Sequence, residues 1–258
     1  EDGKPLNALG NPWNITGEDN SGYGKIIATR GTSRWQASEG PEVIYRDGYY
    51  YLFLAYGSLS VEYNTRVCRS RNIDGPYVDI HGNSAMGSAQ LYPILTAPYR
   101  FDNSYGWVGI SHCGIFDDGA GNWFYTSQGR FPVNVGGNEY SNAIMMGHVR
   151  SIRWDANGWP LVMPERYGAV PQAPITENEI AGDWEHLALT NNTGTQRTSE
   201  TMTYDLDTHK ITSGSWKNAT WTFDAATQTI TTSAGVVLYL QREVDWEASP
   251  RTHTIVYA

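Results

Sequence analysis

Apolar and polar residues alternate with a period of two through most of the 258-residue chain, and helical periodicity is almost absent. A turn that combines an acidic residue with glycine and is followed by an aromatic strand recurs at 46–57, 117–130 and 154–162. The interval between its first two copies, from Asp47 to Asp118, can hold about four short strands with their turns, which is the size of a propeller blade. The pattern therefore predicts an all-β fold that contains blades of a β-propeller.

The pattern of strands and turns changes after a stretch that contains Pro171 and Pro174, and this stretch marks a domain boundary. We expect a partial propeller over residues 1–174 and a small antiparallel β-barrel or sandwich over 175–258, where short alternating strands are joined by brief polar turns. The one helical candidate is 176–186, where Thr176 and Glu179 have the spacing of a capping box.

Charge and composition narrow the class of ligand. The formal net charge is -9, with no long run of either sign, which argues against a nucleic acid partner. No stretch is long and apolar enough for a membrane helix. The 10 Trp and 17 Tyr residues suit β-structure and also offer flat faces on which sugar rings stack, although most of them should fill the core.

Two features concern processing and redox state. Cys68 and Cys113 leave two interpretations open, a disulfide in an oxidising compartment or two buried small hydrophobic residues. The sequence begins with Glu1 instead of Met, so we expect a processed protein or a piece of a longer one.

Two unusual residues occupy matching positions in the first two repeats. Glu39, in "ASEGPEVIY", and His112, in "GISHCGIF", each lie on a short strand just before the acidic-glycine turn. Because the innermost strand of each propeller blade lines the central channel, polar residues on successive innermost strands converge on one axis. His112 has an alternative interpretation as a hydrogen-bonded core histidine.

A carboxyl group on that axis would suit the cleavage of a glycosidic bond, whereas a glutamate in an "EGP" turn is by default a surface residue, and composition alone does not choose between the two. Cleavage of a glycosidic bond needs a proton donor and, with inversion, a second carboxylate that activates water. Glu39, set among apolar and aromatic residues and near other acids, is expected to have a raised pKa and to act as the donor.

Four motifs resemble a known family in order and spacing. They are "WQASEGPEVIYRDGYYYLFLAYGSL", "YNTRVCRSRNIDGPYVD", "SHCGIFDD" and "GHVRSIRWDANGWPLVMPERY", followed by a "GDWEH" module. This combination resembles the arabinan endo-1,5-α-L-arabinosidases of glycoside hydrolase family 43, in particular their larger two-domain type. The similarity extends over nearly the whole chain.

The resemblance implies a five-bladed β-propeller with a small C-terminal barrel that hydrolyses internal α-1,5 linkages of arabinan with inversion. It implies that Glu39 is the general acid and that His112, together with waters, holds a calcium ion in the central channel. Secretion from a bacterium is the expected location, given the substrate.

The family's other two acids, the general base and an aspartate that tunes the acid, lie upstream of the "SEGP" strand. None of Asp2, Glu18 and Asp19 fits their motifs. By this interpretation the chain holds the later blades and most of the barrel, and an N-terminal polypeptide of the same enzyme supplies the rest.

Four further polar residues carry no assigned role. Tyr63, Asn64 and Arg66 lie where their strand should approach the cleft, and for Arg66 and Arg150 an ion pair between blades and a contact to substrate remain equally open. Two alternatives to the endo-acting enzyme also remain: an exo-acting arabinofuranosidase or xylosidase of the same family, and a non-catalytic carbohydrate-binding fragment.

Overall fold

The computed structural model describes residues 25–30, 38–87, 90–101 and 104–258. Within these ranges regular structure is β-sheet apart from two 3₁₀ helices, η2 (Ser141–Ala143) and η3 (Glu177–Glu179), so the all-β prediction is confirmed. Neither of these one-turn helices approaches the length or apolar character that crossing a bilayer requires, and no other helix occurs in the described part.

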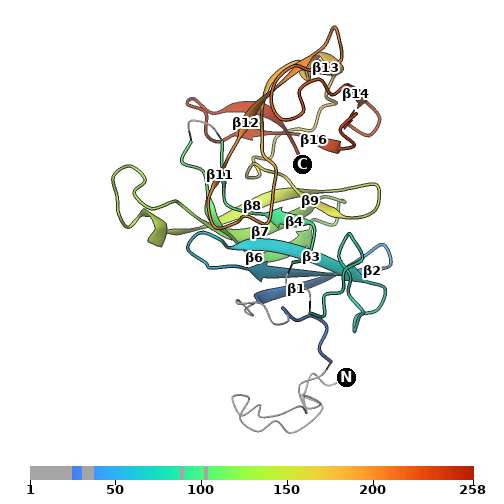
Figure 1. Ribbon diagram of the computed structural model, residues 1–258, viewed down its shortest axis with the longest axis vertical. Helices are drawn as coiled ribbons and strands as arrows, with labels where there is room; N and C mark the ends of the chain where they lie inside the picture. The colour runs from blue at the N-terminus through green and yellow to red at the C-terminus, as the bar shows by residue number, and fades with distance from the viewer. Residues whose placement is uncertain (1–24, 31–37, 88–89, 102–103) are drawn as a thin grey trace.

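Two four-stranded antiparallel sheets follow each other along the chain, each with its strands in sequence order (Figure 1). The first contains β1 (Ser38–Arg46), β2 (Tyr49–Tyr56), β3 (Asn64–Ser70) and β4 (Ile94–Thr96). The second contains β6 (Val108–Asp117), β7 (Trp123–Arg130), β8 (Met145–Trp154) and β9 (Pro160–Val162). The first predicted acidic-glycine turn joins β1 to β2 and the second joins β6 to β7, whereas the third joins β8 to β9.

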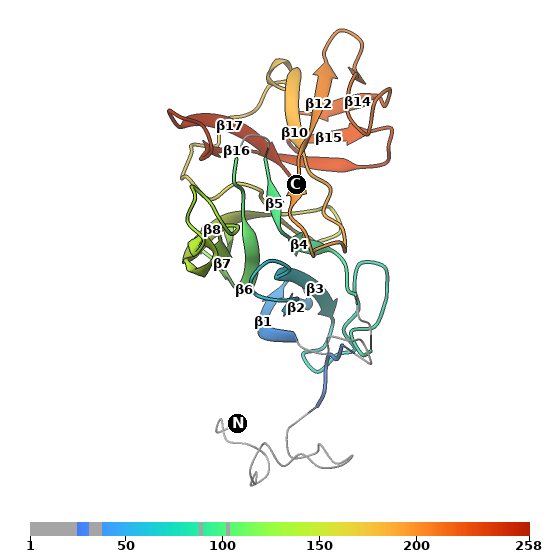
Figure 2. The ribbon, with the colours of Figure 1, turned by 60° about the vertical axis from the view of Figure 1, so that its left-hand side comes forward.

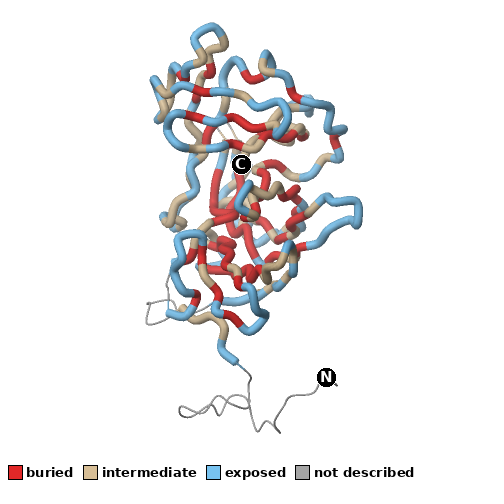
Figure 3. The backbone as a smooth tube through the Cα atoms, turned by 90° about the vertical axis from the view of Figure 1, so that its right-hand side faces the viewer, coloured by how far each residue is buried: buried red, intermediate tan, exposed pale blue. Residues whose placement is uncertain are grey.

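Strand β2 is buried on both faces, which explains its almost uninterrupted apolar sequence. Because successive side chains alternate between faces, Tyr51 and Phe53 pack against the second sheet, in one core with Cys113, Tyr125 and Trp159. Leu52 and Leu54 point the other way, into a separate core with Cys68 and Tyr77. Figure 3 shows the buried residues gathered in the interior of the molecule, with exposed turns around them.

Both cysteines belong to these cores and do not pair. Cys68 and Cys113 are buried free thiols, one in each core, and burial raises the pKa of each thiol to about 12. The interpretation as small buried hydrophobic residues is therefore the one that the structure supports.

The C-terminal part forms a second group of sheets around its own core (Figure 2). One sheet contains β10 (Gly182–His186), β12 (Glu200–Asp205) and β13 (Lys210–Ile211). The other contains β14 (Trp221–Asp224), β15 (Thr229–Thr232), β16 (Val237–Asp245) and β17 (Thr252–Tyr257). Met202, Tyr204 and Trp221 form the centre of this core, each at most 1% exposed, on the faces that alternation predicts. A short parallel pair, β5 (Tyr99–Arg100) and β11 (Arg197–Thr198), joins this part to the rest of the chain.

The helix expected over 176–186 is wrong except for its first turn. The Glu179 carboxylate accepts hydrogen bonds from the backbone N–H and the hydroxyl of Thr176, both at 2.9 Å, and η3 forms there. The 3₁₀ helix ends at Glu179, and β10 begins at Gly182, which has a φ of +117°, and pairs with β12. Pairing of β10 with β12 is favoured over a longer helix because a single helical turn has little stability of its own.

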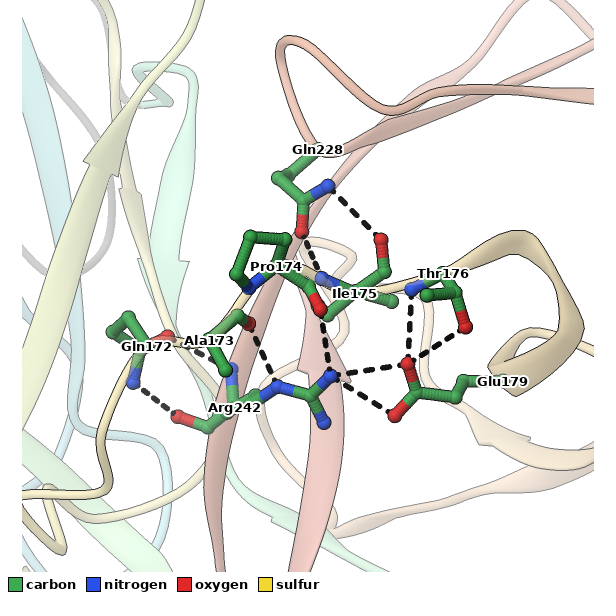
Figure 4. Close-up of polar contacts among 8 residues, drawn as sticks. All are labelled: Gln172, Ala173, Pro174, Ile175, Thr176, Glu179, Gln228 and Arg242. Carbon is green, nitrogen blue, oxygen red and sulfur yellow. Dashed lines mark hydrogen bonds and ion pairs between the residues drawn. The ribbon is translucent and has the colours of Figure 1, made fainter.

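The segment between β9 and η3 contains no strand. Side chains of the C-terminal part form hydrogen bonds with backbone groups of this segment (Figure 4). Arg242 on β16 donates to the carbonyl oxygens of Ala173 and Pro174 at 2.8 and 3.0 Å and pairs with Glu179 at 2.9 Å. Gln172 exchanges two hydrogen bonds with the backbone of Arg242. Backbone groups that no sheet can pair are thus hydrogen-bonded by long polar side chains.

Candidate active site

Glu39 and His112 lie on the first strand of the first and second sheets, β1 and β6, and these two strands pack against each other. Both residues stand at breaks in strand register, Glu39 before the shift that ends at Glu42 and His112 inside the shift between Ser111 and Gly114. Such bulges re-aim a side chain out of the regular alternation. Both side chains are exposed, as a group that must meet substrate has to be.

Tyr63, the residue just before β3, joins the two. Its hydroxyl oxygen lies 2.5 Å from Oε1 of Glu39 and 3.1 Å from Nδ1 of His112. The ring itself is 2% exposed, so it is fixed by packing while its hydroxyl reaches the surface groups. Burial, reinforced by the hydrogen bond to Glu39, raises the pKa of Tyr63 well above its ordinary value of 10, and the phenol keeps its proton.

The single phenol proton assigns the hydrogen bonds of this group. A phenol donates one hydrogen bond and accepts others, and a carboxylate can only accept. Tyr63 therefore donates to Glu39 and accepts from an Nδ1–H on His112. In the neutral imidazole this arrangement leaves Nε2 of His112 with a lone pair that can bind a cation, which is how ligating histidines are usually oriented.

The backbone conformation and the space around residue 40 explain why a glycine follows Glu39. Its φ is +55°, in the left-handed region, and a Cβ added there would lie 3.0 to 3.2 Å from the His112 ring. The imidazole thus lies directly on the backbone of the "SEGP" turn. His112 itself has a φ of +59°, a conformation that non-glycine residues adopt infrequently and that is often found at functional sites.

A buried polar seam beneath the site fixes the two sheets relative to each other. The Ser111 hydroxyl donates to the Asn64 carbonyl at 3.0 Å and lies 2.7 Å from the Thr65 hydroxyl, which also lies 2.7 Å from the hydroxyl of Tyr125. All four residues are at most 1% exposed. Buried polar groups of this kind must be satisfied, so the seam sets the separation of the strands that carry Tyr63 and His112.

The structure brings the remaining candidates inside the fold, away from the exposed site. Asn64 hydrogen-bonds to the backbone of Tyr56 and Glu62, and Arg66, 5% exposed, donates to Asn64 and to the Leu91 carbonyl. The guanidinium of Arg66 also lies over the ring of Tyr56.

Arg150 is likewise internal. It is 2% exposed, donates to the Pro164 carbonyl and lies over the Tyr99 ring. Among the residues that the structure describes, neither Arg66 nor Arg150 forms an ion pair within 4.0 Å, and both side chains are buried, so the described contacts support neither of the two interpretations.

A carboxylate cluster that the sequence pattern did not single out lies at the junction with the C-terminal part. Oxygens of Glu165, Asp245 and Glu247 lie within 4.8 Å of one another, beside a cavity of about 720 Å³. Burial and the proximity of Glu247 raise the pKa of Glu165 above its ordinary value. Among the described residues this is the one group of three such side chains that could hold a metal ion, and it does not include His112.

The residue that sequence reasoning missed is Tyr63, which it placed near the cleft without a role. A tyrosine at the start of an apolar strand is most often a core residue, and here the ring is one. Only its contacts to residues 24 and 49 positions away distinguish it. Asp2, Glu18 and Asp19 lie outside the described residues.

Comparison with known proteins agrees with this architecture. Residues 7–160 match the family described as Glycosyl hydrolases family 43, and residues 164–258 match one described as C-terminal lipocalin-like domain. The Extracellular endo-alpha-(1->5)-L-arabinanase 2 of Bacillus subtilis is 30% identical over 186 residues, which are 64% of this chain and 38% of that protein. The Extracellular endo-alpha-(1->5)-L-arabinanase of Thermotoga petrophila is 30% identical over 185 residues, 64% of this chain and 37% of that protein. The chain thus spans well under half the length of these relatives.

Solved structures give the same picture. A family 43 glycoside hydrolase from Bacillus licheniformis has a TM-score of 0.75 at 24% identity, covering 92% of this chain and 55% of that one. The endo-1,5-α-L-arabinanase of Thermotoga petrophila has a TM-score of 0.71 at 25% identity, covering 85% of this chain and 52% of that one. Since the family match extends over more than half of the sequence, the chain belongs to glycosyl hydrolases family 43.

Proposed function

We propose that this chain is part of a glycoside hydrolase that cleaves internal α-1,5-arabinofuranosyl linkages of arabinan with inversion. The observation that carries the proposal is the contact through which Tyr63 joins Glu39 and His112 on neighbouring first strands. The 30% identity to two endo-arabinanases supports the substrate class and, through the word extracellular in both names, an extracellular location.

In this proposal the two four-stranded sheets are later blades of a five-bladed β-propeller, and the C-terminal sheets form a small antiparallel barrel. The division falls near residue 174, where the chain passes through the segment clamped by Arg242. The TM-scores of 0.75 to the longer family 43 glycoside hydrolase and 0.71 to the longer endo-arabinanase support the assignment. The earlier blades, and with them an N-terminal polypeptide of the same enzyme, complete the ring.

Glu39 acts as the general acid. It gives its proton to the glycosidic oxygen while the bond from that oxygen to the anomeric carbon breaks, and the electron pair of that bond stays on the departing oxygen. A carboxylate of the N-terminal part takes a proton from the water that adds to the opposite face of the sugar. In inverting enzymes the two carboxyl groups lie about 6.5–9.5 Å apart, which leaves room for that water.

His112 holds a calcium ion together with waters. The Nδ1 contact to Tyr63 fits this role, because it leaves Nε2 free for a cation. Calcium prefers six to eight oxygen ligands, so one imidazole must be supplemented mainly by water. When bound, the ion would supply positive charge close to the reacting carboxyl groups.

The complete enzyme, this chain together with the proposed N-terminal part, provides the test. Incubated with debranched arabinan it is expected to release short oligosaccharides first, and Glu39→Gln is expected to abolish release while the unfolding temperature stays unchanged, because an amide cannot donate the proton. Monosaccharide as the first product would instead indicate the exo-acting alternative. Binding of arabinan without any turnover would indicate the non-catalytic one.

A further inference from the structure

The geometry points to Tyr63 as a positioning residue that decides which oxygen of Glu39 carries the catalytic proton. This inference rests on the proposed role of Glu39 as the general acid. It concerns a residue to which neither the family match nor the sequence motifs assign a function.

The first step is the direction of the hydrogen bond. The Tyr63 hydroxyl is a hydrogen-bond donor, and its oxygen lies 2.5 Å from Oε1 of Glu39. When Glu39 is the neutral acid, one of its oxygens is a hydroxyl and the other a carbonyl, and the carbonyl is the better acceptor. With Nδ1–H of His112 donating to the phenol oxygen, the phenol's own proton is directed to Oε1, so Oε1 is the carbonyl oxygen and Oε2 carries the proton.

The second step is that Oε2 is available. No described residue hydrogen-bonds to Oε2, and the Glu39 side chain is exposed. The hydroxyl is therefore free to donate to the glycosidic oxygen of a bound chain. Without Tyr63 the proton could reside on either oxygen and the carboxyl could rotate about its terminal torsion, which is broad for glutamate.

The third step is the rigidity of Tyr63 itself. Its ring is 2% exposed, and its hydroxyl is held from the other side by Nδ1 of His112 at 3.1 Å. A fixed donor costs no reorganisation when the proton leaves. As Glu39 becomes a carboxylate, the hydrogen bond from Tyr63 becomes charge-assisted and strengthens, so its stabilisation is larger in the transition state than in the ground state.

The proton balance is complete within the proposed reaction. The Oε2–H bond breaks, the proton bonds to the departing glycosidic oxygen, and Glu39 is left as a carboxylate. The general base gains the proton that the water loses, and exchange with solvent restores both groups. Tyr63 loses no proton at any stage.

The test is Tyr63→Phe in the complete enzyme, because this change removes the hydroxyl and keeps the buried ring. We expect kcat on debranched arabinan to fall about ten- to hundredfold, with KM within about twofold of the wild type. On a nitrophenyl arabino-oligosaccharide the loss should be less than about threefold, because a nitrophenolate leaves without needing a proton.

Tyr51→Phe is the matched control. Tyr51 is another fully buried tyrosine of the first sheet, and its hydroxyl donates to the Gly158 carbonyl at 2.5 Å, at the opposite end of β2 from Ala55, the partner of Glu39. It should lose a similar amount of stability and keep its activity on both substrates. A purely structural role of Tyr63 would reduce turnover of both substrates equally, and that result would overturn the inference.

A second measurement separates this inference from the proposed function. If Tyr63 acts through Glu39, adding Tyr63→Phe to Glu39→Gln should cost no further activity on the nitrophenyl substrate. Full arabinan turnover by Tyr63→Phe, with none by Glu39→Gln, would refute the positioning role and leave the acid assignment intact. Full turnover by Glu39→Gln would instead refute the acid assignment itself.

Discussion

The Tyr63 hydroxyl donates a 2.5 Å hydrogen bond to Oε1 of Glu39, and so ties the end of the β2–β3 connection to a bulge at the start of β1. The same hydroxyl lies 3.1 Å from His112 on the neighbouring sheet. One buried ring therefore sets the spacing between the two exposed groups of the candidate site.

Gly40→Ala should disturb the site more than it destabilises the fold. The new Cβ would lie 3.0 Å from the His112 ring, so the imidazole must shift, which disturbs its contact with Tyr63. We expect a loss of about 1 kcal/mol in the free energy of unfolding, from the left-handed backbone, and a fall in arabinan turnover of about tenfold or more. Gly119→Ala is the control, since its φ is +74° and nothing lies within 4 Å of its added Cβ. Equal activity in the two variants would contradict the prediction.

His112→Ala should weaken the response to calcium. The wild-type enzyme is expected to lose activity in a chelator and to regain it as calcium is added back. Because the variant lacks the proposed protein ligand, the calcium concentration for half-maximal activity should rise about tenfold or more. His253→Ala, on an exposed histidine of the C-terminal part, should leave that concentration unchanged. An unchanged requirement in His112→Ala would remove the metal from the proposal.

His148 should make the protein acid-sensitive. It is 3% exposed, and burial together with Arg150 and Arg166 lowers its pKa to about 3. The unfolded chain takes up a proton near pH 6.5 and the folded state does not, so this stabilisation is complete above about pH 6.5 and is lost as the pH falls toward 3.

The measurement is the free energy of urea unfolding for wild type and His148→Gln between pH 7.5 and 4.5. Over this range the wild type should lose roughly 2 to 3 kcal/mol relative to the variant, which has no imidazole to protonate. A difference between the two proteins that stays constant with pH would show that His148 does not titrate in this way.

Arg242→Lys should loosen the connection between the two parts of the chain. The guanidinium of Arg242 reaches Ala173, Pro174 and Glu179 at once, which a single ammonium cannot do. We expect the free energy of unfolding to fall by about 1–3 kcal/mol in urea titrations. The exposed Lys217, changed to Ala, should have an effect below about 0.5 kcal/mol. If the two changes cost the same, the clamp does not stabilise the junction.

Most strands and turns could be predicted from the sequence because they depend on residues close together in the chain. Asp47 and Gly48 form the turn that joins β1 to β2, and both have positive φ, which few residues tolerate. The alternation of Met202 and Tyr204 correctly assigned the core face of β12. The capping box at Thr176 was also recognised, but the helix predicted after it yields to the pairing of β10 with β12, a contact made by distant residues.

For the site, the sequence by itself determined that Glu39 and His112 occupy matching strands. The period-two pattern and the repeated turn that place them depend only on residues close together in the sequence. The tertiary structure decided that Tyr63 joins them and that Arg66 and Arg150 are internal. The physical reason is that a hydrogen bond between residues 24 or 49 positions apart exists only once the sheets pack and fix their separation. A tyrosine has the same place in a hydrophobic pattern whether its hydroxyl meets water or a carboxyl group.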